Sequence, residues 1–391
     1  MDGTLADGVV RVGGDARQRF YDARGYGRPL DRNRIELAPV EAAHLLSRGD
    51  LDAVVDERGD SEAADGADAD SDETRLDFRA FLVRTGAALR FAVYKDLRDR
   101  GFYLSPARED WPGVDDALAS DTSVASDSDV DFVVYPRGKG PWDGEVAHRI
   151  RVAGERRSVP ASSLGGVVLA VVDEDGDLTY FETDDEPELD GSEVGGDGSA
   201  DETAPTDVDA DLPTEDDEAL PTDVEADLLD DRVVCYDADD LYENHFYGQR
   251  LFGRNADEGP IQLSLVEGAY LAERGVLDIE SEAVVALARD VEGERFDRRL
   301  RAYAALRDRG VVPKSGFKFG ADFRVYDEFT DVDSLSHSTD LVRVLAPGHA
   351  FYPRDLSLDV RLAGGVRKRM VFALTAANGQ IDWLSVARLT P

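Results

Sequence analysis

The sequence predicts an α/β (α+β) protein made of two tandem copies, each a small N-terminal α/β domain followed by a mixed-sheet α/β domain. Two local patterns support this fold class: apolar residues spaced three and four apart that end at a glycine, and short β-branched runs. Both patterns recur in the same order on either side of one acidic stretch. A length of 391 residues fits this prediction, because one ordinary core rarely holds so many.

Segment pairs that match in order indicate the duplication. The pairs are 7–29 with 230–250, 36–52 with 262–278, 93–106 with 302–315, 131–138 with 322–329, and 167–182 with 370–385. The third pair predicts a helix that ends in a glycine cap. In the last pair two β-rich runs flank a short polar turn, which is typical of a hairpin. Each copy therefore spans about 160 residues.

Shifts in composition set the predicted boundaries. From Thr183 to Asp231, 21 of 49 residues are acidic and none is Lys or Arg, which is typical of a disordered linker. The stretch from Asp56 to Glu73 has no counterpart in the second copy and is interpreted as a surface-loop insertion. The predicted parts are domain 1–75 with the insertion at 56–73, domain 76–182, linker 183–229, domain 230–290 and domain 291–391.

The net charge of −39 would ordinarily argue against a nucleic-acid partner. About half of this charge belongs to the acidic linker, and only five of the 44 basic residues are lysine. Acid-rich, lysine-poor chains suggest a salt-loving host. In 1 M salt, repulsion between surface carboxylates and RNA is screened within about 3 Å. The charge therefore does not exclude RNA.

The lone cysteine and the N-terminal residues indicate a soluble protein of the cytoplasm. Cys235 cannot form an intramolecular disulfide, and a buried structural thiol is the common role of such a residue. The first ten residues lack the basic and apolar regions of a signal peptide. The longest apolar run, 167–172, is far too short to span a membrane. We therefore expect no membrane partner.

The second copy carries motifs that the first copy lacks. It contains Gly-Phe-Lys-Phe-Gly (316–320), Asp-Phe-Arg-Val-Tyr (322–326), a histidine eleven residues later and Val-Arg-Lys (366–368). In this order and at this spacing, these pieces resemble the archaeal tRNA-splicing endonucleases of the tandem-duplicated, homodimeric type. The resemblance spans the whole duplicated chain and is strongest from 306 to 388. It implies that the second domain of each copy is nuclease-like.

Cleaving RNA without a metal requires a base for the 2′-hydroxyl, an acid for the departing 5′-oxygen and a positive charge for the phosphorane-like transition state. The resemblance implies that Tyr326 is the base, His337 the acid and Lys368 the electrostatic stabiliser, with no metal and no cofactor. The products would be a 2′,3′-cyclic phosphate and a 5′-hydroxyl. Each residue alone has an ordinary alternative, as a strand tyrosine, a solvated histidine or part of a charged surface. Their combination is what points to catalysis.

The first copy lacks the complete set. Tyr135 aligns with Tyr326, and His148 lies two residues off the spacing of His337, but Gly165 stands where Lys368 would be. We therefore predict that the first copy is noncatalytic.

An acidic turn in the first copy contains Asp173, Glu174, Asp175 and Asp177. The resemblance implies that this loop docks into a basic groove of a partner subunit, so we expect a dimer contact here. Surface acidity that suits high salt is the alternative.

The resemblance also implies a substrate and the residues that hold it. The substrate would be precursor tRNA whose intron junctions form a bulge-helix-bulge element, and a two-fold homodimer would offer one active site to each cleavage point. Two arginines would clamp a bulged base, for which Arg361 and Arg388 are the candidates.

Two other functions remain open at this point. The chain could be a noncatalytic RNA-binding or structural subunit of a splicing endonuclease, although the second copy keeps the full set of three residues. A metal-dependent nuclease would need a carboxylate pair near Lys368, which the matched region does not convincingly supply.

Overall fold

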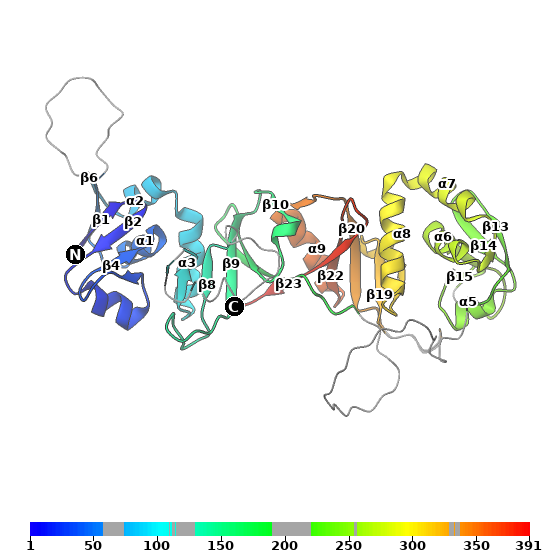
Figure 1. The fold of residues 1–391 in the computed structure, drawn as a ribbon, viewed down its shortest axis with the longest axis horizontal. Helices are drawn as coiled ribbons and strands as arrows, with labels where there is room; N and C mark the ends of the chain where they lie inside the picture. The colour runs from blue at the N-terminus through cyan, green and yellow to red at the C-terminus, as the bar shows by residue number, and fades with distance from the viewer. Residues whose placement is uncertain are drawn as a thin grey trace, which may run out of the picture. The chain divides into compact units, whose positions relative to one another are not determined.

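The computed structural model describes residues 1–57, 74–108, 110–111, 114, 130–189, 220–253, 256–327, 332 and 337–391. These residues fold into two compact units, each with its own hydrophobic core (Figure 1). Unit 1 comprises Met1–Asp185, Gly348–Arg361 and Leu384–Pro391, and unit 2 comprises Glu186–Pro347 and Leu362–Trp383. Among the helices of the described residues, none is both long and apolar enough to cross a bilayer.

Unit 1 begins with a small α/β sheet in the strand order β3-β4-β2-β1-β5-β6. The strands are β1 (Asp2–Ala6), β2 (Val9–Val12), β3 (Arg28–Pro29), β4 (Ile35–Leu37), β5 (Ala53–Asp56) and β6 (Thr74–Leu76). Helices α1 (Pro39–Ser47) and α2 (Phe78–Thr85) follow β4 and β6. Asp7 and Gly8 join β1 to β2 with φ angles of 51° and 74°, the left-handed conformation that an Asp-Gly hairpin turn uses.

The second sheet of unit 1 has the strand order β7-β8-β9-β11-β12-β23. Its strands are β7 (Leu104–Pro106), β8 (Phe132–Val134), β9 (His148–Gly154), β11 (Val168–Val172), β12 (Leu178–Asp184) and the Leu384–Leu389 part of β23 (Ile381–Leu389). Strands β9 and β11 are parallel, and helix α3 (Ala88–Asp99) packs against both. A short pair, β10 (Val159–Pro160) with β21 (Ala350–Phe351), completes the unit.

Unit 2 begins with a five-stranded sheet in the order β15-β16-β14-β13-β17. The strands are β13 (Val224–Leu228), β14 (Arg232–Cys235), β15 (Gln249–Arg250), β16 (Ile261–Ser264) and β17 (Leu277–Asp278). Helices α5 (Asp239–Glu243) and α6 (Leu265–Glu273) accompany this sheet. Ser264 and Glu267 form a capping box at the start of α6, which fixes where the helix begins. The predicted role of Cys235 fits its position, since the thiol is buried in this core.

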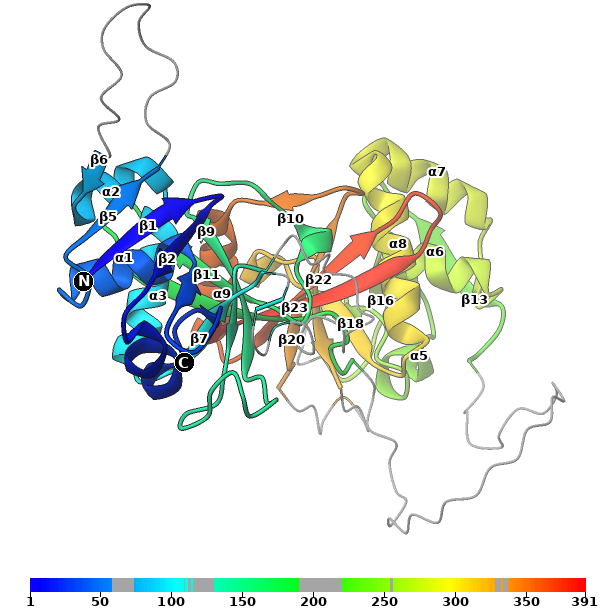
Figure 2. The ribbon, with the colours of Figure 1, turned by 60° about the vertical axis from the view of Figure 1, so that its left-hand side comes forward.

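The second sheet of unit 2 has the order β18-β19-β20-β22-β23. Its strands are β18 (Val312–Ser315), β19 (Phe323–Tyr326), β20 (Asp340–Leu345), β22 (Arg369–Thr375) and the start of β23. Helices α7 (Ser281–Glu292) and α8 (Glu294–Arg307) precede it, and α8 packs against β18 and β20 (Figure 2). The chain between β20 and β22 includes helix α9 (Pro353–Gly365), as a parallel pair requires a long connection.

The two copies have the same topology. Strands β7-β8-β9-β11-β12 of unit 1 and β18-β19-β20-β22-β23 of unit 2 follow the same order, and the third and fourth strands of each set are parallel. Each set is preceded by a small α/β sheet. The predicted fold class, two tandem α/β copies, is confirmed.

The predicted linker at 183–229 is too long at both ends. Strand β12 extends to Asp184, and β13 lies within the range assigned to the linker. In β13 the apolar Val224, Ala226 and Leu228 pack against the core while the acidic residues between them are exposed. A highly acidic segment can therefore form a strand when its charges share the solvent face. Residues 190–219 of the linker and 58–73 of the predicted insertion lie outside the described residues.

Candidate active site

Strand pairing in unit 2 brings the three predicted catalytic residues to one edge of the sheet. Tyr326 is the last residue of β19, His337 stands three residues before β20, and Lys368 directly precedes β22. Because β19 is antiparallel to β20 and β20 is parallel to β22, the end of β19 and the starts of β20 and β22 share an edge.

Hydrogen bonds between the three segments hold this edge together. The Thr339 N–H donates to the Val325 carbonyl at 2.9 Å, and the Arg369 N–H donates to the Thr339 carbonyl at 3.1 Å. The Lys368 ammonium donates to the Ser338 carbonyl, next to His337. The backbone therefore fixes the spacing of the three segments.

The three side chains differ in exposure. Tyr326 is 7% exposed, Lys368 is half-buried and His337 is exposed. Burial lowers the pKa of Lys368, the Arg324 guanidinium lowers it further, and Asp340 opposes the shift. Arg324 also lies over the Tyr326 ring, 5.5 Å from its centroid. Two cations, Lys368 and Arg324, thus lie at this edge together with the Asp340 carboxylate.

A pocket near this edge has a largely acidic lining. Glu188, Asp327 and Asp340 line it, and its one cation, Arg369, is already paired with Asp340 at 2.6 Å. Such a lining repels phosphate. None of the three predicted catalytic residues is among the pocket's lining residues.

Phe246 supports Tyr326 from the neighbouring small domain of unit 2. The two rings meet edge to face with centroids 5.7 Å apart. Phe246 has a φ of 51°, a left-handed conformation that is costly for a bulky residue. The Lys314 ammonium donates to the Phe246 carbonyl at 3.2 Å and to the Gly248 carbonyl at 2.9 Å, which holds this turn in place.

Lys314 forms a buried ion pair with Glu267 at 2.6 Å. Burial alone would raise the pKa of Glu267, but the Lys314 ammonium and the N–H groups of Ser264 and Gly248 hold it below its ordinary value. Sequence reasoning missed Phe246, Lys314 and Glu267. The signal available was the lysine itself, which is rare in this chain.

Strand register gives a residue-by-residue comparison with the first copy. Val134 is opposite His148, as Val325 is opposite Asp340, and Ile150 is opposite Val168, as Val342 is opposite Val371. Tyr135 therefore corresponds to Tyr326, and Gly165 to Lys368, as the sequence predicts.

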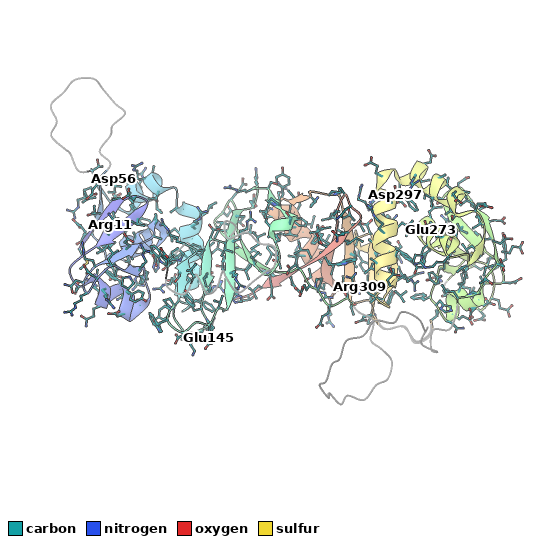
Figure 3. The ribbon with its side chains drawn as sticks, viewed as in Figure 1. Arg11, Asp56, Glu145, Glu273, Asp297 and Arg309 are labelled. Carbon is teal, nitrogen blue, oxygen red and sulfur yellow. The ribbon has the colours of Figure 1, made fainter. Side chains whose placement is uncertain are left out.

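The strand register gives His148 a different offset from the one counted along the sequence. This residue corresponds to Asp340, so it lies three residues off the position of His337. Counting back three residues along each sequence from this pair, Glu145, labelled in Figure 3, matches His337. Counted along the sequence from the tyrosines, the offset is two residues, and the two values differ because the loops before the two strands differ in length.

The first copy cannot accept a lysine at Gly165 without rearrangement. Gly165 has a φ of 142°, and a Cβ atom there would lie 3.0 Å from the Cβ and Cγ atoms of Asp185. Tyr135 is fully buried, and its hydroxyl donates to the Ser105 hydroxyl at 2.9 Å. Burial raises the pKa of Tyr135 to about 12. These features disfavour catalysis in the first copy.

The supporting residues differ between the copies as well. By the same register Ser105 corresponds to Lys314. The Gly27 N–H donates to Glu41 as the Gly248 N–H donates to Glu267, so Gly27 corresponds to Gly248. Two residues earlier in each copy, Gly25 is therefore the counterpart of Phe246. The buried carboxyl Glu41 has no lysine at the matching position, and burial raises its pKa to about 7.

The predicted dimer loop forms the hairpin turn between β11 and β12. The Asp173 carboxylate accepts from the N–H groups of Asp175 and Asp177 at 3.0 and 2.8 Å. Glu174 is exposed and pairs with Arg156 at 2.9 Å. The corresponding turn of the second copy, 376–380, has the same backbone bonds but no acidic residue.

The two predicted base-clamping arginines belong to unit 1, whereas the three predicted catalytic residues belong to unit 2. Arg361 is exposed on α9, and Arg388 is exposed on β23 opposite Phe181.

Comparison with known proteins supplies the family context. The model of the tRNA intron endonuclease N-terminal domain matches residues 1–63 and 224–288, and the model of the tRNA intron endonuclease catalytic C-terminal domain matches residues 296–383. The chain is 60% identical to a tRNA-splicing endonuclease of Haloferax volcanii and 50% identical to one of Haloarcula marismortui, over the full length of each. It is 33% identical to a tRNA-splicing endonuclease of Methanococcoides burtonii, over 97% of both chains.

Proposed function

Because this chain belongs to the tRNA intron endonuclease family, we propose that it excises introns from precursor tRNA in the cytoplasm by metal-independent cleavage at both splice sites of a bulge-helix-bulge element. The observation that carries this proposal is the shared sheet edge of Tyr326, His337 and Lys368. This edge lies within the residues that match the catalytic-domain model. A noncatalytic subunit would have no need for this arrangement.

In the proposed reaction the side chains of the second copy move both protons. Tyr326, as the phenolate, removes the proton of the 2′-hydroxyl, and the 2′-oxygen attacks the adjacent phosphorus. The bond to the 5′-oxygen breaks, and His337, as the imidazolium, protonates that oxygen. The products are a 2′,3′-cyclic phosphate and a 5′-hydroxyl.

Lys368 stabilises the charge that develops on the non-bridging phosphate oxygens. One of its three N–H bonds is given to the Ser338 carbonyl, which orients the ammonium and leaves two donors for the phosphate. Arg324 adds a second positive charge nearby. Half-burial of Lys368 strengthens its interaction with the phosphate, because less water screens it.

The substrate geometry suits a two-fold homodimer. A bulge-helix-bulge presents two related cleavage points, and two copies of the chain offer one catalytic domain, 291–391, to each. The noncatalytic region 1–182 then serves assembly and RNA binding. Arg361 and Arg388 are exposed planar cations of the kind that stack on a splayed base.

The function is tested by incubating the pure protein in high salt with a bulge-helix-bulge transcript, with and without a chelator, and mapping the ends. We expect two cuts that the chelator does not affect. No cutting would contradict the enzyme assignment, and chelator-sensitive cutting would contradict the mechanism.

The dimer role of the acidic turn has its own test. Replacing residues 173–177 by Ala-Ala-Asn-Gly-Gln, the sequence of the matching turn 376–380, removes four negative charges while keeping a hairpin that the fold already tolerates. We expect the variant to elute as a monomer in size-exclusion chromatography. If the variant remains dimeric, the acidic turn is not the dimer contact, and its acidity is then explained as an adaptation to salt.

A further inference from the structure

A hydrogen bond and two glycines fix the conformation of the Gly-Phe-Lys-Phe-Gly turn (316–320). Residues Phe317–Phe319 form a short 3₁₀ helix, closed by a hydrogen bond from the Phe319 N–H to the Gly316 carbonyl at 2.8 Å. A Cβ atom on Gly316 would lie 2.8 Å from the Ala321 carbonyl oxygen, and Gly320 has a left-handed φ of 70°. Glycine at both ends therefore lets the turn pack tightly against the start of β19.

The two aromatic rings of this turn differ in exposure, since Phe319 is partly buried and Phe317 is exposed. The Phe319 ring lies beside the predicted catalytic lysine, with its centroid 5.8 Å from the Lys368 ammonium. Phe317 is 87% exposed, the highest value among the large apolar side chains of the described residues. The adjacent Lys318 is exposed as well. An exposed aromatic ring and an exposed cation thus belong to the same turn as the ring that contacts Lys368.

The first copy lacks the Gly-Phe-Lys-Phe-Gly motif in its sequence. The register aligns Ser105 with Lys314 and Asp131 with Asp322, so residues 107–130 stand between the matching positions, and this sequence contains no Phe-Lys-Phe. The Phe-Lys-Phe motif is therefore specific to the copy that carries Tyr326, His337 and Lys368. A general need for solubility or folding would not restrict it to that copy.

We propose that Phe317 is a stacking platform for an unpaired nucleobase of the RNA substrate at or beside the cleavage point. Sequence-tolerant recognition of unstacked bases uses exposed aromatic faces, with a cation for the neighbouring phosphate. Only Lys318 separates Phe317 from Phe319, so their Cα atoms lie within about 8 Å of one another. The base that Phe317 binds then belongs to a nucleotide near the phosphate that Lys368 contacts, and Lys318 binds the phosphate that follows.

The inference rests on the proposed function and is tested by binding in a cleavage-deficient background. In His337→Ala protein, the additional change Phe317→Ala should weaken the binding of a bulge-helix-bulge RNA by roughly ten- to hundredfold, whereas Phe317→Trp should restore it. Phe252 is 74% exposed and lies outside this sheet, so Phe252→Ala is the matched control and should bind like the parent protein.

A second RNA with abasic bulge nucleotides identifies the contact. The parent protein should bind this RNA as weakly as the Phe317→Ala protein binds the intact one, and Phe317→Ala should add no further loss. An equal loss on both RNAs, or no loss on the intact RNA, would overturn the proposal. A change in oligomeric state caused by Phe317→Ala would also overturn it, since the ring would then contact protein. If the wild-type protein neither binds nor cuts the intact RNA, the proposed function itself fails.

Discussion

His337→Ala should slow single-turnover RNA cleavage by about 10²- to 10⁴-fold, the usual contribution of a positioned general acid. RNA binding should stay within a few fold of the wild type, because the imidazole is exposed and its removal leaves the hydrogen bonds of the strand edge intact. The measurement is a cleavage rate at saturating enzyme, together with a dissociation constant for a non-cleavable RNA.

The first copy supplies the controls for this experiment. Glu145 occupies the position that matches His337, and His148 is the first-copy histidine nearest to it in sequence. Neither Glu145→Ala nor His148→Ala should change the cleavage rate. Equal losses from His337→Ala and His148→Ala would show that catalysis is assigned to the wrong copy.

Lys314→Ser, which copies Ser105 of the first copy, should destabilise unit 2 by about 3–5 kcal/mol at pH 8. The change leaves the Glu267 carboxylate buried with only the N–H groups of Ser264 and Gly248 and the Ser264 hydroxyl as donors. Burial should then raise its pKa, as it raises that of Glu41 to about 7. A carboxyl whose folded pKa lies above its unfolded value stabilises the fold while protonated, and this stability is lost as the pH rises through the folded pKa. The deficit should therefore be smaller at pH 5 than at pH 8.

Denaturant unfolding at the two pH values, in constant high salt, measures this deficit. Lys95 pairs with Asp99 at the surface of α3, so Lys95→Ser is the control and should cost less than about 1 kcal/mol at either pH. A Lys314→Ser deficit that is equally small would mean that Glu267 is solvated. Cleavage should also slow in Lys314→Ser, because the turn that carries Phe246 loses two hydrogen bonds beneath Tyr326.

Much of the fold could be predicted from the sequence because the two copies can be compared with each other. Helix ends, the hairpin at 173–177 and the order of strands repeat in both copies, so each segment is predicted twice. The bounds of the acidic linker were predicted wrongly because they were set by acidic composition alone. The alternation of apolar and acidic residues in β13 was not taken into account. A high charge content indicates solubility but not the absence of structure. The alternation of apolar Val224, Ala226 and Leu228 with polar residues is what indicates the strand.

The candidate site is predicted from the sequence only in part. Tyr326, His337 and Lys368 stand out as a set because their spacing resembles a family pattern and because Gly165 breaks it in the other copy. Phe246 could not be found in this way, since its contact with Tyr326 joins residues 80 positions apart and depends on a left-handed backbone. Pairing of Lys314 with Glu267 likewise needs the tertiary fold.

The central claim is that the second copy cuts RNA by using the 2′-hydroxyl as the nucleophile. Removing that one oxygen atom from the substrate tests this claim most directly. The measurement is the cleavage rate of a bulge-helix-bulge RNA with a 2′-deoxy nucleotide on the 5′ side of one splice site. We predict that this site is no longer cut, while the unmodified site is still cut and ends in a 2′,3′-cyclic phosphate. Cleavage at the 2′-deoxy site would contradict the mechanism, because the attacking oxygen would then have to come from water.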